Sequence, residues 1–198
     1  MPSNKINSKE FLTSYLDDFS DLVKPDEKII DQLGKVAVLL KDVHSQKKKV
    51  LIFGNGGSAA ISSHFSVDLT KNAGLRCVNF NEADLITCFA NDYGFERWVE
   101  KAVDFYGDEG DLLIAISSSG SSKNMLNGVK AARNGNFKAV VTLSGFTEDN
   151  PLRQLGDINV WINSRAYNFV ENIHQVWLLA IVDLIIGKAE YSSDPDES

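Results

Sequence analysis

Cysteine and positive charge are both scarce in this sequence. Only two cysteines occur among 198 residues, Cys77 and Cys88, and they lack the CxxC spacing of metal and redox motifs. We therefore expect reduced thiols without a disulfide framework, as in cytoplasmic proteins. The net charge is −7, and the only basic cluster is the short run from Gln46 to Lys49. This balance argues against direct nucleic-acid binding.

Long hydrophobic segments are also missing. The first residues, MPSNKINSKEF, contain no apolar region of the kind found in signal peptides. The longest apolar stretch runs from Val176 to Ile186, is broken by Asp183, and is too short to cross a bilayer. We expect a cytoplasmic protein without a membrane segment, in which this stretch is a buried helix. The hydrophobic fraction of 43% is typical of a globular protein.

Apolar strand-like segments alternate with helical segments along most of the chain. Strands are predicted at 49–53, 75–80, 112–116, 138–143 and 158–162, and the last helix at 167–187. This alternation predicts an α/β fold, a doubly wound five-stranded parallel sheet of order 2-1-3-4-5 flanked by helices. Residues 1–45 are predicted to add an N-terminal helical hairpin to a core over 46–190. We expect a single domain over 1–190 and a disordered acidic tail over 191–198.

A glycine-rich loop, GNGGSA, follows the first predicted strand. Glycines let the backbone approach a ligand closely, and the N-terminus of the next helix attracts anions. The candidate binding residues here are Asn55, Gly56, Gly57 and Ser58. The letters also match G-x-G-x-x-A, so a nicotinamide-dependent oxidoreductase is an alternative, and a tight turn without a ligand is another. The oxidoreductase has poor support, because no acidic residue closes the second strand and Glu82 comes one step later.

A serine-rich loop, SSSGSS, follows the third predicted strand at residues 117–122. Its hydroxyls and backbone N–H groups at a helix N-terminus are well suited to hold a phosphate. A flexible linker is disfavoured, because the loop lies between a buried strand and an amphipathic helix. In a sheet of order 2-1-3-4-5, strands 1 and 3 are neighbours at the topological switch point. The sequence therefore predicts that both loops form one phosphate site.

Four motifs occur in a specific order: GNGGSAAISSHFSVDL, FANDYGFERWVEKAV, GDLLIAISSSGSSKN and VVTLSGF. Together they resemble the SIS (sugar isomerase) family, and most of all its phosphoheptose isomerases, which convert sedoheptulose 7-phosphate to a heptose phosphate. The resemblance implies a homotetramer whose active sites are completed across subunits. It also implies a substrate contact at Asp92 and phosphate contacts at Ser58, Ser117, Ser118, Ser119 and Ser122.

The chain departs from the family pattern where the family handles protons and metal. The family's H-x-x-x-E is His64 and Asp68 here, one helical turn apart. Glu171 and Leu179 stand where the family has a glutamine and a histidine. We name His64, Asp68 and Glu171 as the catalytic candidates and as an incomplete ligand set for zinc, the one cofactor expected. His174 is poorly placed to replace the missing histidine.

Two functions remain open from these residues. One is a sugar-phosphate isomerase with an altered catalytic site, in which Asp68 or Glu171 is the base. The other is a non-catalytic sugar-phosphate-binding or regulatory protein, favoured by the leucine at position 179. For either function we expect a homo-oligomer, most simply a tetramer, packed through the N-terminal helices and the last helix. The apolar side chains expected at this contact are Trp177, Leu178, Ile181 and Ile185.

Overall fold

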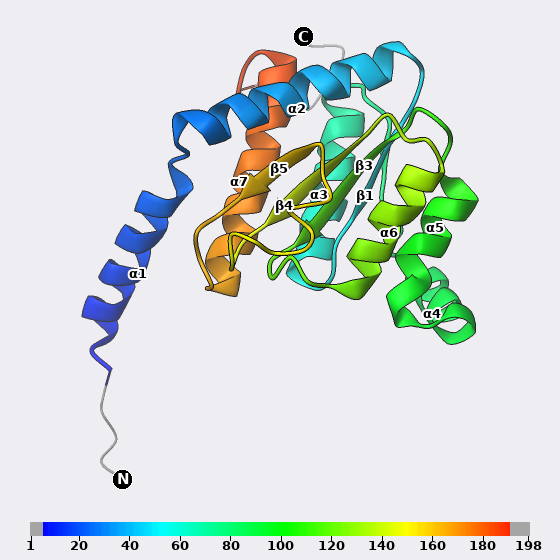
Figure 1. Cartoon of the computed structure of the whole chain (residues 1–198). Helices are drawn as coiled ribbons and strands as arrows, with labels where there is room; N and C mark the ends of the chain where they lie inside the picture. The colour runs from blue at the N-terminus through cyan, green and yellow to red at the C-terminus, as the bar shows by residue number, and fades with distance from the viewer. Residues whose placement is uncertain (1–5, 191–198) are drawn as a thin grey trace.

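A five-stranded parallel sheet forms the centre of the computed structural model, which describes residues 6–190 (Figure 1). Its order is β2-β1-β3-β4-β5, which confirms the predicted topology. The tail at 191–198 lies outside the described residues. The strands are β1 (Val50–Phe53), β2 (Cys77–Val78), β3 (Leu112–Ser117), β4 (Ala139–Ser144) and β5 (Ile158–Trp161).

Helices cover both faces of this sheet. One face carries α2 (Glu27–Ser45), α3 (Gly57–Lys71) and α7 (Tyr167–Ile186), and the other carries α5 (Trp98–Tyr106) and α6 (Lys123–Asn134). The helix α4 (Ala83–Tyr93) and a 3₁₀ turn, η1 (Phe95–Arg97), lie beside α5 (Figure 1). Side chains alternate along β3, so that Leu112 and Ile114 face the first layer and Leu113 faces the second. The fully apolar strands are thus explained by burial on both faces.

The edge strand β2 is shorter than the predicted segment 75–80. Its pairing with β1 covers only Cys77 and Val78. Beyond Val78, side-chain amides tie the chain to α3: Asn79 Nδ2 donates to Ser66 Oγ at 2.7 Å, and Asn81 Nδ2 donates to the Ala59 carbonyl at 2.8 Å. These bonds draw the backbone away from the sheet, so the strand ends early.

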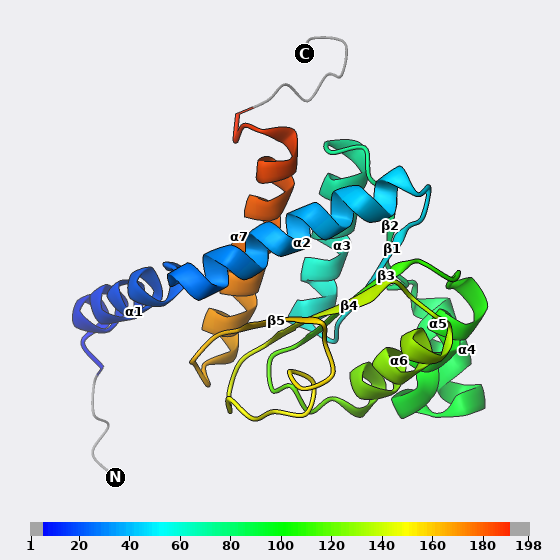
Figure 2. The same cartoon turned by 45° about the horizontal axis from the view of Figure 1, so that its top comes forward.

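The two N-terminal helices form as predicted, but they do not fold back on each other as a hairpin would. Figures 1 and 2 show α1 (Ser8–Val23) extending outward from the start of α2. Pro25 lies between them, and Asp26 caps α2 by accepting from the Ile29 N–H at 2.8 Å. No residue of α1 is buried, and Tyr15 contacts the core edge-on at Phe169, with ring centroids 4.5 Å apart. Tyr15 and Phe19 both meet Phe169 on α7, so α1 packs on α7 and is not folded back along α2.

The last helix, α7, is largely a core helix. Trp177, Leu178 and Ile181 are 5%, 1% and 2% exposed, so these side chains cannot supply the oligomer surface for which they were predicted. These side chains are buried in the core, where they pack against the sheet and α2. Among the described residues, α7 is the only helix long and apolar enough to span a membrane, but 44% of its apolar window is buried within the chain. The buried part packs against the sheet and α2, while Val176 and Leu184 stay exposed in the single chain.

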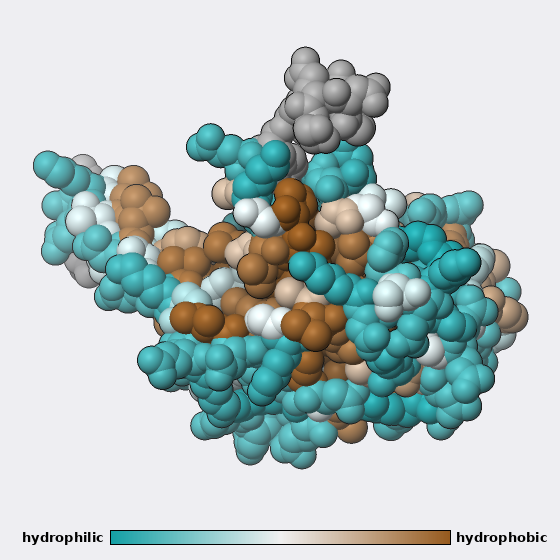
Figure 3. Space-filling view, turned by 90° about the horizontal axis from the view of Figure 1, so that it is seen from above, coloured by the Kyte–Doolittle hydropathy of each residue, from teal (hydrophilic) through white to brown (hydrophobic). Residues whose placement is uncertain are grey.

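Other apolar side chains remain on the surface. Figure 3 shows hydrophobic residues gathered in a band across the face seen from above, bordered by hydrophilic ones. Apart from Tyr167 at the start of α7, the exposed apolar residues of the three helices concerned are Phe11, Leu12 and Leu16 on α1, Ile30 and Val38 on α2, and Val176 and Leu184 on α7. We call this set the apolar band. Its residues are those that the sequence pattern could not separate from the core.

Candidate functional site

The two predicted loops meet at the carboxyl ends of β1 and β3. These strands are paired neighbours, with Phe53 opposite Ala115 near their ends. The helices that follow them, α3 and α6, leave on opposite faces of the sheet. Both helix N-termini therefore point at one place, which confirms the predicted switch point.

A cavity of about 110 Å³ lies at this place. It contains the predicted residues of both loops, except the glycines, together with Glu171 from α7. Ile116 and Tyr167, which sequence reasoning missed, complete its wall. Larger cavities lie elsewhere among the described residues, and one of about 340 Å³, between the α1–α2 junction and β5, shares no lining residue with it. The lining of the smaller cavity, which we call the serine cavity, is Asn55, Ser58, Ile116, Ser117, Ser118, Ser119, Ser122, Tyr167 and Glu171.

The serine loop is arranged with hydroxyls toward this cavity. Ser117 Oγ and Ser122 Oγ lie 3.0 Å apart, so the two ends of the loop share a hydrogen bond. Ser118 Oγ is buried near the Glu171 carboxylate and, among residues 6–190, makes no hydrogen bond of normal geometry. A buried hydroxyl without a partner is costly unless a ligand or water completes it. The loop therefore has donor capacity to offer an anion.

Hydrogen bonds to α6, the helix that follows the neighbouring strand β3, hold the glycine loop in place. Asn55 and Asn124 exchange two amide hydrogen bonds, of 3.0 and 2.8 Å, which join the loop after β1 to α6. Gly56 has φ +55°, a conformation that favours glycine. A Cβ on Gly57 would lie 2.2 Å from Glu171 Oε2. Glycine at position 57 thus lets the Glu171 carboxylate approach the N-terminus of α3.

Glu171 is the carboxylate of the serine cavity. Burial raises its pKa above the usual value for glutamate, and the nearby Ser118 hydroxyl acts in the opposite direction. A carboxylate with a raised pKa in a cavity is a candidate general base. Glu171 is therefore the best placed of the three catalytic candidates.

His64 and Asp68 form a separate pair further along α3. His64 Nε2 lies 3.4 Å from Asp68 Oδ2, and its Nδ1 lies 3.1 Å from the Gln175 amide nitrogen on α7. Neither side chain lines the serine cavity, and that of His64 is 47% exposed. Gln175 was not predicted. Its signal was its spacing, because Tyr167, Glu171 and Gln175 recur every four residues on the face of α7 that meets α3.

The predicted zinc ligands are not assembled in this chain. Within residues 6–190, no three histidine, cysteine, aspartate or glutamate side chains are grouped to hold a metal ion. His64 and Asp68 lie together, Glu171 lies at the serine cavity, and Leu179 offers no donor atom. The donor set, as placed in one subunit, therefore does not fit zinc.

Asp92 and His174 lie away from the serine cavity. Asp92 is exposed near the end of α4, with its Oδ2 3.7 Å from Cys88 Sγ, and its substrate contact stays a prediction. His174 is fully buried, and its Nε2 lies 3.3 Å from the Ser144 carbonyl oxygen. Burial lowers the pKa of His174 to about 4, so the imidazole is neutral at physiological pH. It is a core residue that joins α7 to the end of β4.

The sequence matches the SIS domain and proteins named phosphoheptose isomerase. The family model of the SIS domain matches residues 14–145. A phosphoheptose isomerase of Fusobacterium nucleatum is 34% identical over 180 residues, covering 87% of this chain and 91% of that protein.

Solved structures agree with the sequence matches. The phosphoheptose isomerase of Neisseria gonorrhoeae superposes with a TM-score of 0.83 at 27% identity, covering 89% of this chain and 98% of that one. The enzyme of Francisella tularensis gives 0.80 at 25% identity, covering 92% and 100%. With these matches and the serine cavity at the switch point, the chain belongs to the SIS domain family, as a phosphosugar-isomerase-type member akin to the phosphoheptose isomerases.

Proposed function

We propose that this chain binds a sugar phosphate with its phosphate in the serine cavity and isomerises the sugar between aldose and ketose. The observation that carries this is the convergence of two helix N-termini, the serine hydroxyls and one carboxylate on the same cavity. Among residues 6–190, no lysine or arginine lines it, so hydroxyls, backbone N–H groups and helix ends must supply the stabilisation of the anion.

The size of the cavity supports a site in which the phosphate is enclosed and the sugar lies outside. Pockets that enclose a whole small ligand span about 300–1,000 Å³. At about 110 Å³, the serine cavity suits the phosphate alone. The sugar would then extend past Tyr167 and Glu171, toward a surface that a second subunit can complete.

Glu171 is the proposed base. Isomerisation moves a proton between two adjacent carbons through an enediol, while a second proton moves in the same direction between their two oxygens. Glu171 would take the proton from one carbon and return it to the next. Its raised pKa brings its proton affinity closer to working pH than that of an ordinary glutamate.

Two departures from the family pattern, outside the serine cavity, limit the reaction on sedoheptulose 7-phosphate. Asp68 is one methylene shorter than the family's glutamate, and a misplacement of about 1 Å can cost about a hundredfold in rate. Leu179 cannot transfer a proton, a loss of roughly 10²–10⁴-fold. We therefore expect weak or absent turnover of this heptulose phosphate, with binding preserved.

A second candidate is a non-catalytic sugar-phosphate-binding or regulatory protein. Two observations favour it: the leucine at position 179 and the separation of the His64–Asp68 pair from Glu171. Both candidates use the same serine cavity, so turnover distinguishes them and binding does not.

The test compares the natural chain with a triple variant that carries Asp68→Glu, Glu171→Gln and Leu179→His together. This variant, the restored chain, has the family's residues at all three positions. Each is assayed on a panel of pentose, hexose and heptose phosphates, with and without zinc, and bound metal is measured by mass spectrometry. Turnover of another sugar phosphate by the natural chain supports the isomerase. Turnover and zinc in the restored chain alone support the binding protein, and heptulose turnover by the natural chain at an enzyme's usual rate contradicts the altered site.

We further propose a cytoplasmic homotetramer in which the apolar band is covered. The band provides apolar groups on α1, α2 and α7, and α1 has no buried residue in the single chain. Exposed apolar patches of this kind commonly mark subunit contacts.

A further inference from the structure

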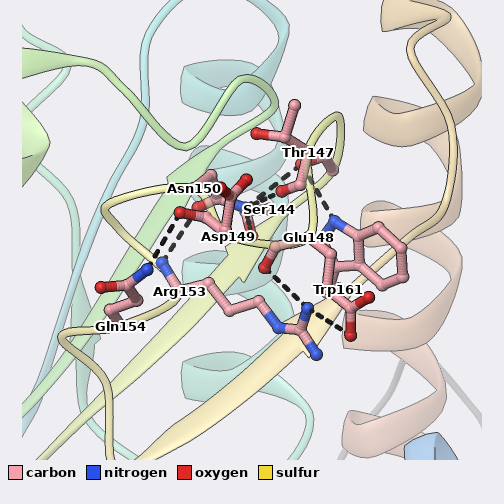
Figure 4. A network of polar contacts seen from close by, with 9 residues as sticks. Ser144, Thr147, Glu148, Asp149, Asn150, Arg153, Gln154 and Trp161 are labelled. Atoms are coloured by element: carbon pink, nitrogen blue, oxygen red, sulfur yellow. Dashed lines mark hydrogen bonds and ion pairs between the residues drawn. The ribbon is translucent and has the colours of Figure 1, made fainter.

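We propose that Asn150, in the connection between β4 and β5, is a positioning residue that holds the serine loop in its anion-binding conformation. The inference rests on the proposed function, since it assumes that the serine loop binds phosphate. Asn150 lies in a polar network of the connection between β4 and β5, shown in Figure 4.

The Asn150 side chain is buried and fully used. It is 1% exposed, and its Nδ2 donates to Ser144 Oγ at 3.0 Å, to the Thr147 carbonyl at 2.9 Å and to the Gly145 carbonyl at 3.3 Å. Its Oδ1 accepts from the Arg153 N–H at 3.0 Å. An amide with partners on both of its ends has a fixed orientation.

The serine loop packs directly on this amide. Gly120 has φ +66°, and a Cβ at that position would lie 1.9 Å from Asn150 Oδ1. Only glycine tolerates both the backbone conformation and the contact. Position 120 and position 150 therefore form a fitted pair.

The same connection binds the carbonyls of the loop. The Gly145 N–H donates to the Ser118 carbonyl at 2.9 Å, and the Leu152 N–H donates to the Gly120 carbonyl at 2.9 Å. A trans peptide points its C=O and N–H in opposite directions. Fixing the Ser118 carbonyl therefore turns the Ser119 N–H away from the connection.

The connection is itself anchored to β5. The Arg153 guanidinium lies 4.8 Å from the Trp161 ring centroid and donates to the Glu148 carbonyl at 2.8 Å. Trp161 Nε1 donates to the Gly145 carbonyl at 3.1 Å (Figure 4). Asn150, which is itself held by this segment, packs against Gly120 and thereby limits the movement of the serine loop.

The test replaces Asn150 by aspartate, which has the same shape but places a carboxylate oxygen, which cannot donate, against the three oxygens that Nδ2 contacts. Asn150→Ser removes the amide without adding charge, and Asn163→Asp, at an exposed position after β5, is the matched charge control. Calorimetry measures the Kd for inorganic phosphate and for sedoheptulose 7-phosphate. Hydrogen exchange follows the amides of 117–122 against those of β1.

Both Asn150 variants should raise Kd at least tenfold and speed exchange at 117–122 while β1 stays protected, and Asn163→Asp should change neither. If the natural chain binds and Asn150→Ser binds equally well, the inference is wrong and the proposed function stands. If Asn150→Asp does not fold, as judged by circular dichroism, Asn150→Ser decides alone. If the natural chain binds neither probe, the proposed function and this inference fall together.

Discussion

Ser119 is the residue at which the phosphate proposal is most simply tested. It lines the serine cavity, whereas its neighbour Ser121 is exposed and does not. Ser119→Ala should weaken sugar-phosphate binding by about 1–3 kcal/mol, because a hydrogen bond to a charged ligand is lost. Calorimetry should show this as a roughly five- to 150-fold rise in Kd, while Ser121→Ala leaves Kd unchanged. Equal effects of the two substitutions would contradict the assignment.

Glu171 shares its cavity with the proposed phosphate, so two negative groups compete for one space. Glu171→Gln should bind inorganic phosphate more tightly than the natural chain and should lose turnover of any substrate. Because burial raises the folded-state pKa, the ionised carboxylate costs stability above that pKa, and the cost disappears below the unfolded value of about 4.3. Glu171→Gln should therefore raise Tm at pH 8 and lose this advantage near pH 4. Weaker phosphate binding by Glu171→Gln would show that the carboxylate is not a competitor.

The residues of the site divide by how locally they are encoded. The glycine and serine loops could be predicted, because each is a run of suitable residues between a buried strand and a helix. Tyr167 and Gln175 share the four-residue spacing of Glu171, but that spacing does not reveal their roles, which arise from the packing of α7 against α3. Asn150 escaped for the same reason, since its partners belong to a loop that the sequence shows as merely polar.

At the scale of elements, α7 and β4 are joined through a buried histidine. His174 has its pKa lowered from the usual 6.5 to about 4 by burial, and its Nε2 lies against the Ser144 carbonyl. Between pH 6.5 and about pH 4, His174 is therefore protonated in the unfolded chain but neutral in the folded chain. The stability from this group is complete above pH 6.5 and is lost progressively toward pH 4, by about 3 kcal/mol.

Urea unfolding at pH 7.5 and pH 5 measures this loss. His174→Gln should have a smaller difference in unfolding free energy between the two pH values than the natural chain. His44→Gln, at an exposed position on α2, is the control and should keep the full difference. A natural chain equally stable at both pH values would refute the role of His174.

Helices and strands were predictable as elements, but their packing was less so. The periodicity of residues 8–45 indicates two helices, and Pro25 marks the boundary between them. Their relative direction depends on what Tyr15 and Phe19 meet on α7, which no local pattern contains. The early end of β2 likewise depends on the contacts of Asn79 and Asn81 with α3.

At the scale of the whole molecule, the apolar band predicts assembly. Light scattering at micromolar concentration should give the mass of a tetramer, about four times 21.8 kDa. Leu12→Glu with Leu16→Glu, on the exposed side of α1, should lower this mass while the circular dichroism of the fold is retained. The control, Glu10→Gln on the same helix, should leave the mass unchanged. A natural chain that is monomeric would overturn the proposed assembly.

The most direct measurement is a crystal structure of the chain with sedoheptulose 7-phosphate. We predict that the phosphate lies in the serine cavity, within hydrogen-bonding distance of the hydroxyls of Ser117, Ser119 and Ser122, with the sugar extending past Glu171. A phosphate bound elsewhere on the protein, with the serine cavity filled only by water, would contradict the account.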